Sequence, residues 1–276
     1  MNYLGGLRNG FSFGLTGLDI EAKAALIERQ VLSQFPGGRD HFGAVRTQLI
    51  RSDKDDPATN EEAVAVYRIT VKDRDERKVG RAFSNVAVEF GLASIPGFFG
   101  TGGGPGPAQP YGVHWPAFVP SDVAPQVVTI LGEGSTGVEN TAPGLPAAPV
   151  QPLAVELPPA PSGPTRRVPL GLVCGARSGD KGGNANVGLF TRSATAFAWL
   201  DAYLDVERFH ELFPDADGLE VRRHRLANLW PLNFVIVGML EEGVAASTRL
   251  DDQAKGFGEY VRARVVDVPE SLLAPA

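Results

Sequence analysis

Residues 147–164, AAPVQPLAVELPPAPSGP, decide how the chain is divided. This stretch cannot form a helix, because each proline lacks a backbone donor and clashes with the preceding turn. It belongs to a wider proline-rich segment, since 14 of the 22 prolines lie between Thr101 and Thr165. We therefore expect an extended, semi-rigid linker between two domains. The alternative interpretation is an arm that crosses to the neighbouring domain and packs on it.

The predicted boundaries follow from this composition. The linker covers 133–165, and from Gly134 to Thr165 only Glu139 and Glu156 are charged. One domain then spans 1–132 and the other spans 166–276. We leave open whether the glycine-rich loop at 100–106 is a lid or an ordinary surface loop.

The first domain is predicted to be an α+β sandwich that lacks its first strand. Apolar residues at helical spacing predict helices from Ile20 to Val31 and from Val79 to Phe90. Strands are expected at 44–50, 62–72 and 127–131. In the second of these, residues alternate between two faces, and Arg68, Thr70 and Lys72 share the face opposite the apolar one.

The second domain also mixes strands and helices without strict alternation, which favours an α+β class. Strands are expected at 168–175, 185–191, 219–226 and 233–240. Ser193 and Asp205 are expected to cap two helices, and a last helix is expected over 254–265.

Composition excludes several classes of protein. With 26 Lys and Arg against 32 Asp and Glu, the net charge of −6 does not suit a nucleic-acid coat. We find no apolar stretch of membrane-spanning length and no signal-peptide pattern, so we expect a cytoplasmic protein without membrane contact. The single cysteine and four scattered histidines lack ligand spacing, so neither a metal nor a resident cofactor is expected.

One polar segment, 176–186, carries the groups that chemistry needs. Its glycines allow backbone N–H groups to converge on an anion, and Arg177 and Lys181 add positive charge. Asp180 supplies a carboxylate that can act as a base. The same residue types also suit a hairpin turn, and the pattern alone does not choose between the two.

A second polar cluster lies at 249–256. Asp251 or Asp252 is a natural helix N-cap, which is the simpler interpretation. Gly256 and Gly258, early in the expected helix, would allow close approach of a ligand or another element.

These segments carry a resemblance to a known family. ARSGDKGGNANVGLF, followed by LANLWPLNFVIVGMLEEGVAASTRLDDQAKGFG, resembles the C-terminal domain of the acyclic terpene utilisation (AtuA-like) family. GLTGLDIEAKAAL resembles the segment that opens the second half of large family members. The resemblance covers nearly the whole chain except the linker. It implies a ferredoxin-like second domain, so the expected fold is two split β-α-β sandwiches joined by the linker.

The chain departs from the family pattern at its start. Full-length members begin with a large α/β domain, and the resemblance implies that this chain starts after it. The resemblance therefore implies either a fragment or a separate partner chain of that type, and we expect an oligomer. The missing first strand is expected to come from that part.

The function implied by the resemblance is the catabolism of branched acyclic acids handled as CoA thioesters. We expect a lyase- or hydratase-type enzyme acting on a small acid or an acyl-CoA, with CoA entering only as part of the substrate. The alternative is a non-catalytic assembly subunit. The expected catalytic residues are Asp180, Lys181 and Asp251. The expected substrate-binding residues are Arg177, Ser178, Gly179, Gly182, Asn184, Asn186 and Lys255.

Overall fold

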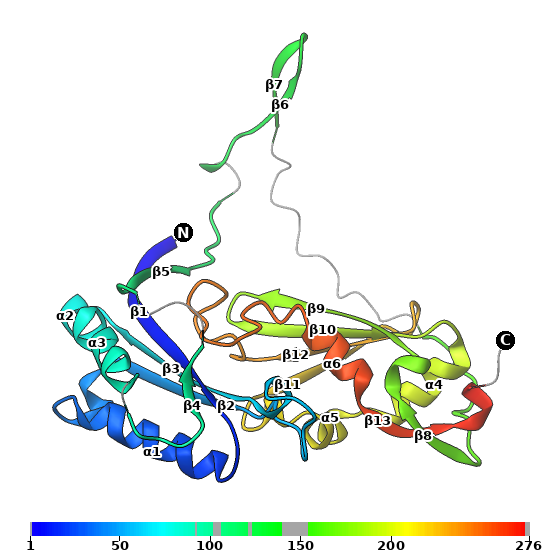
Figure 1. Cartoon of the computed structure of the whole chain (residues 1–276). Coiled ribbons are helices and arrows are strands. Elements are labelled where there is room, and N and C mark those ends of the chain that lie inside the picture. Colours follow the sequence, from blue (N-terminus) through cyan, green and yellow to red (C-terminus); the bar gives the residue numbers. More distant parts are fainter. Residues whose placement is uncertain (1, 92, 102–105, 121–122, 140–153, 274–276) are drawn as a thin grey trace. The chain divides into compact units, whose positions relative to one another are not determined.

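The computed structural model describes residues 2–91, 93–101, 106–120, 123–139 and 154–273 (Figure 1). They fall into two compact units. The first unit is Asn2–Val113 together with Ala245–Leu250, and the second is His114–Val244 together with Asp251–Ala276. The described residues of the expected linker, 133–139 and 154–165, are thus grouped with the second unit. None of the described helices is long and apolar enough to cross a membrane.

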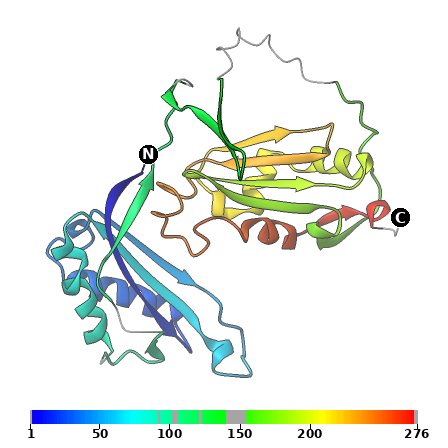
Figure 2. The same cartoon turned by 90° about the horizontal axis from the view of Figure 1, so that it is seen from above.

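The first unit is a ferredoxin-like sandwich with all of its strands. Its sheet has the order β2-β3-β1-β4, and β5 also pairs with β1. The strands are β1 (Asn2–Leu15), β2 (Ala44–Ile50), β3 (Ala65–Asp73), β4 (Phe98–Gly100) and β5 (Gln109–His114). The helices are α1 (Ile20–Ser33), α2 (Glu76–Val79) and α3 (Arg81–Phe90), and Figure 2 shows them on one side of this sheet.

The prediction that the first strand is missing is wrong. β1 occupies the inner position of the sheet and pairs antiparallel with β3 from Leu7↔Asp73 to Leu15↔Ala65. The strand contains four glycines, which weaken strand propensity. Two of them are covered by rings from neighbouring strands, because a Cβ at Gly14 would overlap Phe99 and a Cβ at Gly5 would meet Tyr111. The first domain therefore needs no strand from elsewhere.

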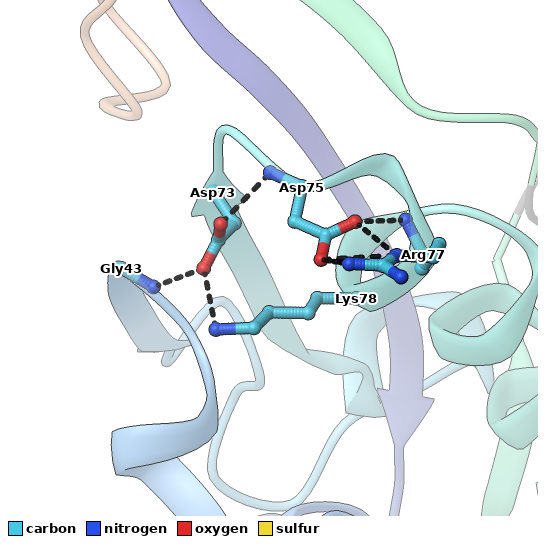
Figure 3. A network of polar contacts seen from close by, with 5 residues as sticks. All are labelled: Gly43, Asp73, Asp75, Arg77 and Lys78. Carbon is cyan, nitrogen blue, oxygen red and sulfur yellow. Dashed lines mark hydrogen bonds and ion pairs between the residues drawn. The ribbon is translucent and has the colours of Figure 1, made fainter.

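A polar network fixes the turn between β3 and α2 (Figure 3). The Asp73 carboxylate accepts hydrogen bonds from the backbone N–H groups of Gly43 and Asp75, both at 2.9 Å, and from Lys78 Nζ at 3.3 Å. Burial by itself raises the pKa of the Asp73 carboxyl, but these donors outweigh it and hold the pKa below its usual value. Asp75, whose pKa is lowered to about 2 by Arg77, starts α2 by accepting from the Arg77 N–H.

The second unit is built around a four-stranded antiparallel sheet in the order β11-β12-β10-β9. Its strands are β9 (Gly175–Lys181), β10 (Asn184–Phe190), β11 (Val221–Arg225) and β12 (Pro231–Ile236), and its helices are α4 (Ala194–Tyr203), α5 (Val206–Leu212) and α6 (Phe257–Ala263). The two predicted caps are confirmed, because Ser193 accepts from Ala196 N and Asp205 accepts from Arg208 N.

The edge of this sheet next to β10 is formed by β9 instead of the strand that follows the last helix. In a β-α-β-β-α-β sandwich the strand after the second helix pairs with the first strand. Here that edge belongs to β9, which precedes β10 as a hairpin. The strand after α6, β13 (Val265–Pro269), instead pairs with β8 (Thr165–Pro169) in a separate two-stranded sheet.

The expected single strand at 168–175 is wrong, because two strands and a short 3-10 turn share this region. Pro169 ends β8, and Leu170–Leu172 form the turn. Cys174 then lies between the turn and β9, and it is 5% exposed. The apolar run is thus a connection folded onto the core rather than one extended strand.

The expected strand at 127–131 forms, but it does not join the first sheet. β6 (Gln126–Ile130) pairs with β7 (Gly134–Val138), and every residue of this hairpin is exposed. Residues 140–153 of the expected linker and 102–105 of the glycine-rich loop lie outside the described residues. Further along, Val155 and Leu157 pack against the core of the second unit, which favours the packed-arm interpretation for that part.

Candidate functional site

The polar motif at 176–186 forms a β-hairpin. Lys181 pairs with Asn184, so Gly182 and Gly183 make a two-residue turn. Gly182 has φ +64°, a backbone conformation that glycine adopts without strain. A Cβ at Gly183 would overlap the Glu241 carbonyl oxygen, so this position also requires glycine. The turn interpretation is confirmed, and the expected anion-cradling loop is replaced by two paired strands.

This strand register separates the candidate side chains onto two faces. Ser178 is the cross-strand partner of Val187, and Asp180 is that of Ala185, so each pair shares one face of the sheet. The side chains of Val187 and Ala185 belong to the core under the helices. Side chains alternate along a strand, so Arg177, Gly179 and Lys181 belong to the opposite, helix-free face. The register thus separates Lys181 from Ser178 and Asp180. Arg177 and Gly179 still lie beside Lys255, because Arg177 lines a cavity with Lys255 and a Cβ at Gly179 would lie 3.4 Å from Lys255 Nζ.

On the helix side, α6 is fixed closely to β9. The Gly258 N–H donates to Ser178 Oγ at 2.8 Å, and Ser178 Oγ donates to the Lys255 carbonyl at 3.4 Å. A Cβ at Gly258 would lie 3.2 Å from Ser178 Oγ, so glycine makes this approach possible. Lys255 Nζ then lies 3.8 Å from Asp180 Oδ1. The structure thus brings together Ser178, Asp180 and Lys255 from the two predicted clusters.

Asp251 organises the turn before α6. Its two carboxylate oxygens accept the N–H groups of Lys255 and Gly256, each at 2.8 Å. The expectation that Asp251 or Asp252 is the N-cap of this helix is wrong, because the N-cap of α6 is Gly256, which has no side-chain cap, and Asp251 instead ties the turn that precedes the helix. Asp251 therefore holds the backbone of Lys255 in place, and its catalytic role stays a prediction.

The asparagines of the motif are engaged in bonds that join strands and turns. Asn186 Nδ2 donates to Asn233 Oδ1 at 2.9 Å, and Asn184 Oδ1 accepts from the Gly238 N–H at 2.9 Å. Lys181 Nζ donates to the carbonyl of Asp180 at 2.9 Å. These contacts stabilise the hairpin and its neighbours, and they leave substrate binding by these side chains as a prediction.

Two cavities adjoin the β9–α6 contact and share Ala176 in their walls. The smaller has a volume of about 320 Å³ and includes Arg177, Ser178, Lys255 and Glu259 in its lining. The larger has a volume of about 990 Å³, at the upper end of the range for small-molecule sites. Its lining includes Leu172, Val173, Phe190, Arg192, Ser193 and Arg262.

Sequence reasoning missed the residues of the larger cavity. Arg262 spans its wall by donating to the carbonyls of Cys174 and Gly171, and it pairs with Glu259. Arg192 is exposed next to the N-cap of α4. Arg192 directly precedes Ser193, a predicted N-cap, and this position in the sequence could have identified Arg192 as a candidate site residue. Burial raises the pKa of the Cys174 thiol in this wall to about 12, so it is not a nucleophile near neutral pH.

Among the described residues, no group of three or more His, Cys, Asp or Glu side chains is placed to hold a metal ion.

Comparison with known proteins identifies both units. Residues 1–130 match the family model described as "Acyclic terpene utilisation family protein AtuA". Residues 168–267 match the "AtuA ferredoxin-like domain". No curated protein matches the chain. No solved structure matches it either. Because the two matched regions together cover most of the sequence and agree with its two sandwiches, the chain belongs to the acyclic terpene utilisation (AtuA) family.

Proposed function

We propose that the chain contributes a lyase- or hydratase-type active site for a branched acyclic acid, handled as its CoA thioester or as the free acid. Membership of a family implicated in acyclic terpene utilisation supports the substrate class. The observation that carries the proposal is the pairing of Asp180 with Lys255 at the β9–α6 contact, beside two cavities. We place the reaction in the cytoplasm.

The two side chains supply complementary chemistry. A hydratase adds water across the double bond conjugated to an acyl carbonyl. In this proposal the water oxygen bonds to the β-carbon while the Asp180 carboxylate takes a proton from that water. The protonated Asp180 carboxyl then donates a proton to the α-carbon. Lys255 stabilises the negative charge that develops on the acyl oxygen between these two events. Both side chains are partly exposed, at 36% for Asp180 and 64% for Lys255, so a substrate can reach them.

The cavities suit the two ends of such a substrate. The smaller cavity includes Ser178 and Lys255 and would hold the reacting acyl group. The larger cavity begins at the shared residue Ala176 and includes Leu172, Val173 and Phe190, which suit a branched hydrocarbon chain. Arg192, exposed in the lining of that cavity, would favour an anionic group there.

The experiment compares Asp180→Asn and Lys255→Met with the wild type in hydration of branched enoyl-CoA thioesters, followed by loss of the enoyl absorbance. We expect Asp180→Asn to lower kcat at least about 100-fold, since general acid-base groups contribute about 10²–10⁴. Lys255→Met should lower kcat/KM through both binding and charge stabilisation. Asp217→Asn, an exposed carboxylate of the same unit, is the matched control.

Two results would reject the assignment. Unchanged turnover of Asp180→Asn with an intact fold would remove the acid-base role. A loss of the same size in Asp217→Asn would show that the assay reports charge or stability rather than chemistry at β9. The assay should be repeated in the presence of an AtuA-type α/β chain, which we propose as the partner of this chain.

The second candidate, a purely assembling subunit, is weaker than the sequence indicates. Its main support was an incomplete first sheet, and β1 fills that place. The exposed β6–β7 hairpin favours it in part, because an isolated two-stranded hairpin is marginally stable in water. An assembly role predicts that Asp180→Asn keeps full turnover when the partner is present, which separates the two candidates.

A further inference from the structure

The first unit has a sheet face that its own helices do not cover. Strand register places Phe13, Leu15, Tyr67 and Ile69 on the core face beneath the helices. The alternate positions of β1, β2 and β3 therefore form the other face. At these positions stand the cations Arg8, Arg46, Arg68 and Lys72, together with Gly10, Ser12, Gly14, Ala44, Gln48, Ile50, Val66 and Thr70.

The charged residues that β1, β2 and β3 place on this face are all cations. The four cations come from three adjacent strands, and no Asp or Glu occupies the positions between them. Arg8 lies directly opposite Lys72 in the β1–β3 register. Like charges in opposite positions repel each other and destabilise a sheet. Lys72 is buried, and its Nζ lies 5.0 Å from the centroid of the Tyr111 ring, which partly offsets this repulsion.

Arg68 provides the second, independent observation. Its Nη1 atom is buried and has no hydrogen-bond partner among the described residues. Buried donors in folded proteins are almost always paired, and a charged one is the most unfavourable to leave without an acceptor. Arg68 lies on the middle strand β3, with Ser12 and Gln48 beside it on the neighbouring strands. The orphaned nitrogen is therefore at the centre of the basic face.

A segment from the second half of the sequence lies over the adjacent part of this face. Ala245–Leu250 belongs to the first unit. Arg8 donates to the Ser247 carbonyl at 3.1 Å, and Arg46 donates to Thr248 Oγ1 at 3.3 Å. Ser247 and Thr248 are buried, at 2% and 8% exposure. The segment thus gives the basic face a polar wall with hydroxyl groups.

We propose that this face, centred on Arg68, binds a phosphate-bearing anion. Guanidinium groups match the geometry of phosphate oxygens, and several donors from adjacent strands can converge on one group. The inference goes beyond the proposed reaction and does not require it, because every residue involved belongs to the first unit. A free phosphate compound and the phosphates of a CoA thioester share this chemistry.

RNA is the less favoured ligand. Open sheet faces that read single-stranded RNA stack bases on aromatic side chains of the central strands. The corresponding positions of β1 and β3 hold no aromatic residue, and the rings that lie on this face, Phe99 at Gly14 and Tyr111 at Lys72, come from β4 and β5.

The experiment measures binding of inorganic pyrophosphate, CoA, a branched carboxylic acid and a short RNA to the full chain by calorimetry. Arg68→Met keeps the length and shape of the side chain and removes the charge. We expect it to weaken binding of the phosphate compounds at least about tenfold. We expect its melting temperature without ligand to match or exceed that of the wild type, because the orphaned donor is gone. Arg29→Met, at an exposed position of α1, is the control and should bind normally.

Comparing the ligands distinguishes the possible sources of the phosphate group. Tighter binding of CoA than of pyrophosphate indicates the thioester, and equal binding indicates a free phosphate compound. Failure of both to bind, equal binding of the carboxylic acid, or equal loss in Arg29→Met would overturn the proposal. Tighter binding of RNA than of either phosphate compound would replace it with nucleic-acid recognition. Because calorimetry needs no turnover, these results do not depend on the Asp180 hypothesis.

Discussion

The Gly258 N–H donates to Ser178 Oγ over 2.8 Å, which joins residues 80 positions apart at the β9–α6 contact. The same hydroxyl donates to the Lys255 carbonyl. One side chain therefore holds both the start of α6 and the turn that carries Lys255. The distance between Asp180 and Lys255 depends on this small contact.

Ser178→Ala should therefore lower both stability and turnover. It leaves the partly buried Gly258 N–H without its acceptor, a loss of about 1–3 kcal/mol in the free energy of unfolding. Chemical denaturation measures the stability, and the hydration assay at a temperature well below unfolding measures kcat/KM. Ser162→Ala, at an exposed position of the same unit, should change neither. Wild-type stability in Ser178→Ala would show that the contact is incidental.

Asp73 gives a prediction with a defined pH dependence. Its carboxyl is 12% exposed and its pKa lies below the model-peptide value of 3.8. A lowered pKa in the folded state adds stability above pH 3.8, and this stability is lost as the pH falls through the folded pKa. Asp73→Asn should therefore lower the free energy of unfolding by about 1–3 kcal/mol at pH 7.

The test is a pair of denaturation series at pH 7 and at pH 3 or below. The difference between wild type and Asp73→Asn should shrink in the acid series, because the wild-type carboxylate becomes protonated there. Asp40→Asn, at an exposed position of the same unit, is the control. A difference that stays constant with pH would show that Asp73 acts by shape rather than by charge.

The sequence predicts periodic elements well and glycine-rich ones poorly. The spacing of Ile20, Ile27 and Val31 predicts α1, and the alternation around Tyr67 predicts β3, because each element buries one regular face. β1 is missed because its four glycines hide the alternation. Aromatic rings from β4 and β5 pack over two of these glycines. Such contacts join residues far apart in the sequence, so no local pattern predicts them.

The candidate site shows a similar limit. Residue types in the motif indicate a polar site, and the structure does bring Asp180 and Lys255 together. The sequence does not show that Lys181 lies on the other face from Asp180, because this requires the motif to be a paired strand rather than a loop. The signal for the basic face of the first unit is present in the sequence, as Arg68 and Lys72 alternate with the core of β3. Their meaning depends on Arg8 and Arg46, which only the register places beside them.

Cys174 should be almost inert in the folded protein. Burial raises its pKa from 9.0 to about 12, and the thiolate is the reactive form. The raised pKa adds stability below pH 9, and this stability is lost as the pH rises through about 12. We expect iodoacetamide to alkylate the native thiol at least about 100-fold more slowly at pH 8 than the thiol in urea. Mass spectrometry of timed samples measures both rates. Equal rates would show that the wall of the larger cavity opens readily.

Gly179 allows a test of Lys255 that leaves the lysine in place. Gly179 is buried, and a Cβ there would lie 3.4 Å from Lys255 Nζ. Alanine would just fit, whereas the branched side chain of valine would displace the ammonium group from Asp180. Valine also favours strands more than glycine does, so Gly179→Val should not lower the free energy of unfolding. We therefore expect Gly179→Ala to keep most of kcat/KM and Gly179→Val to lose at least about tenfold at wild-type stability. If both variants keep full activity, the position of Lys255 beside Asp180 has no part in the reaction.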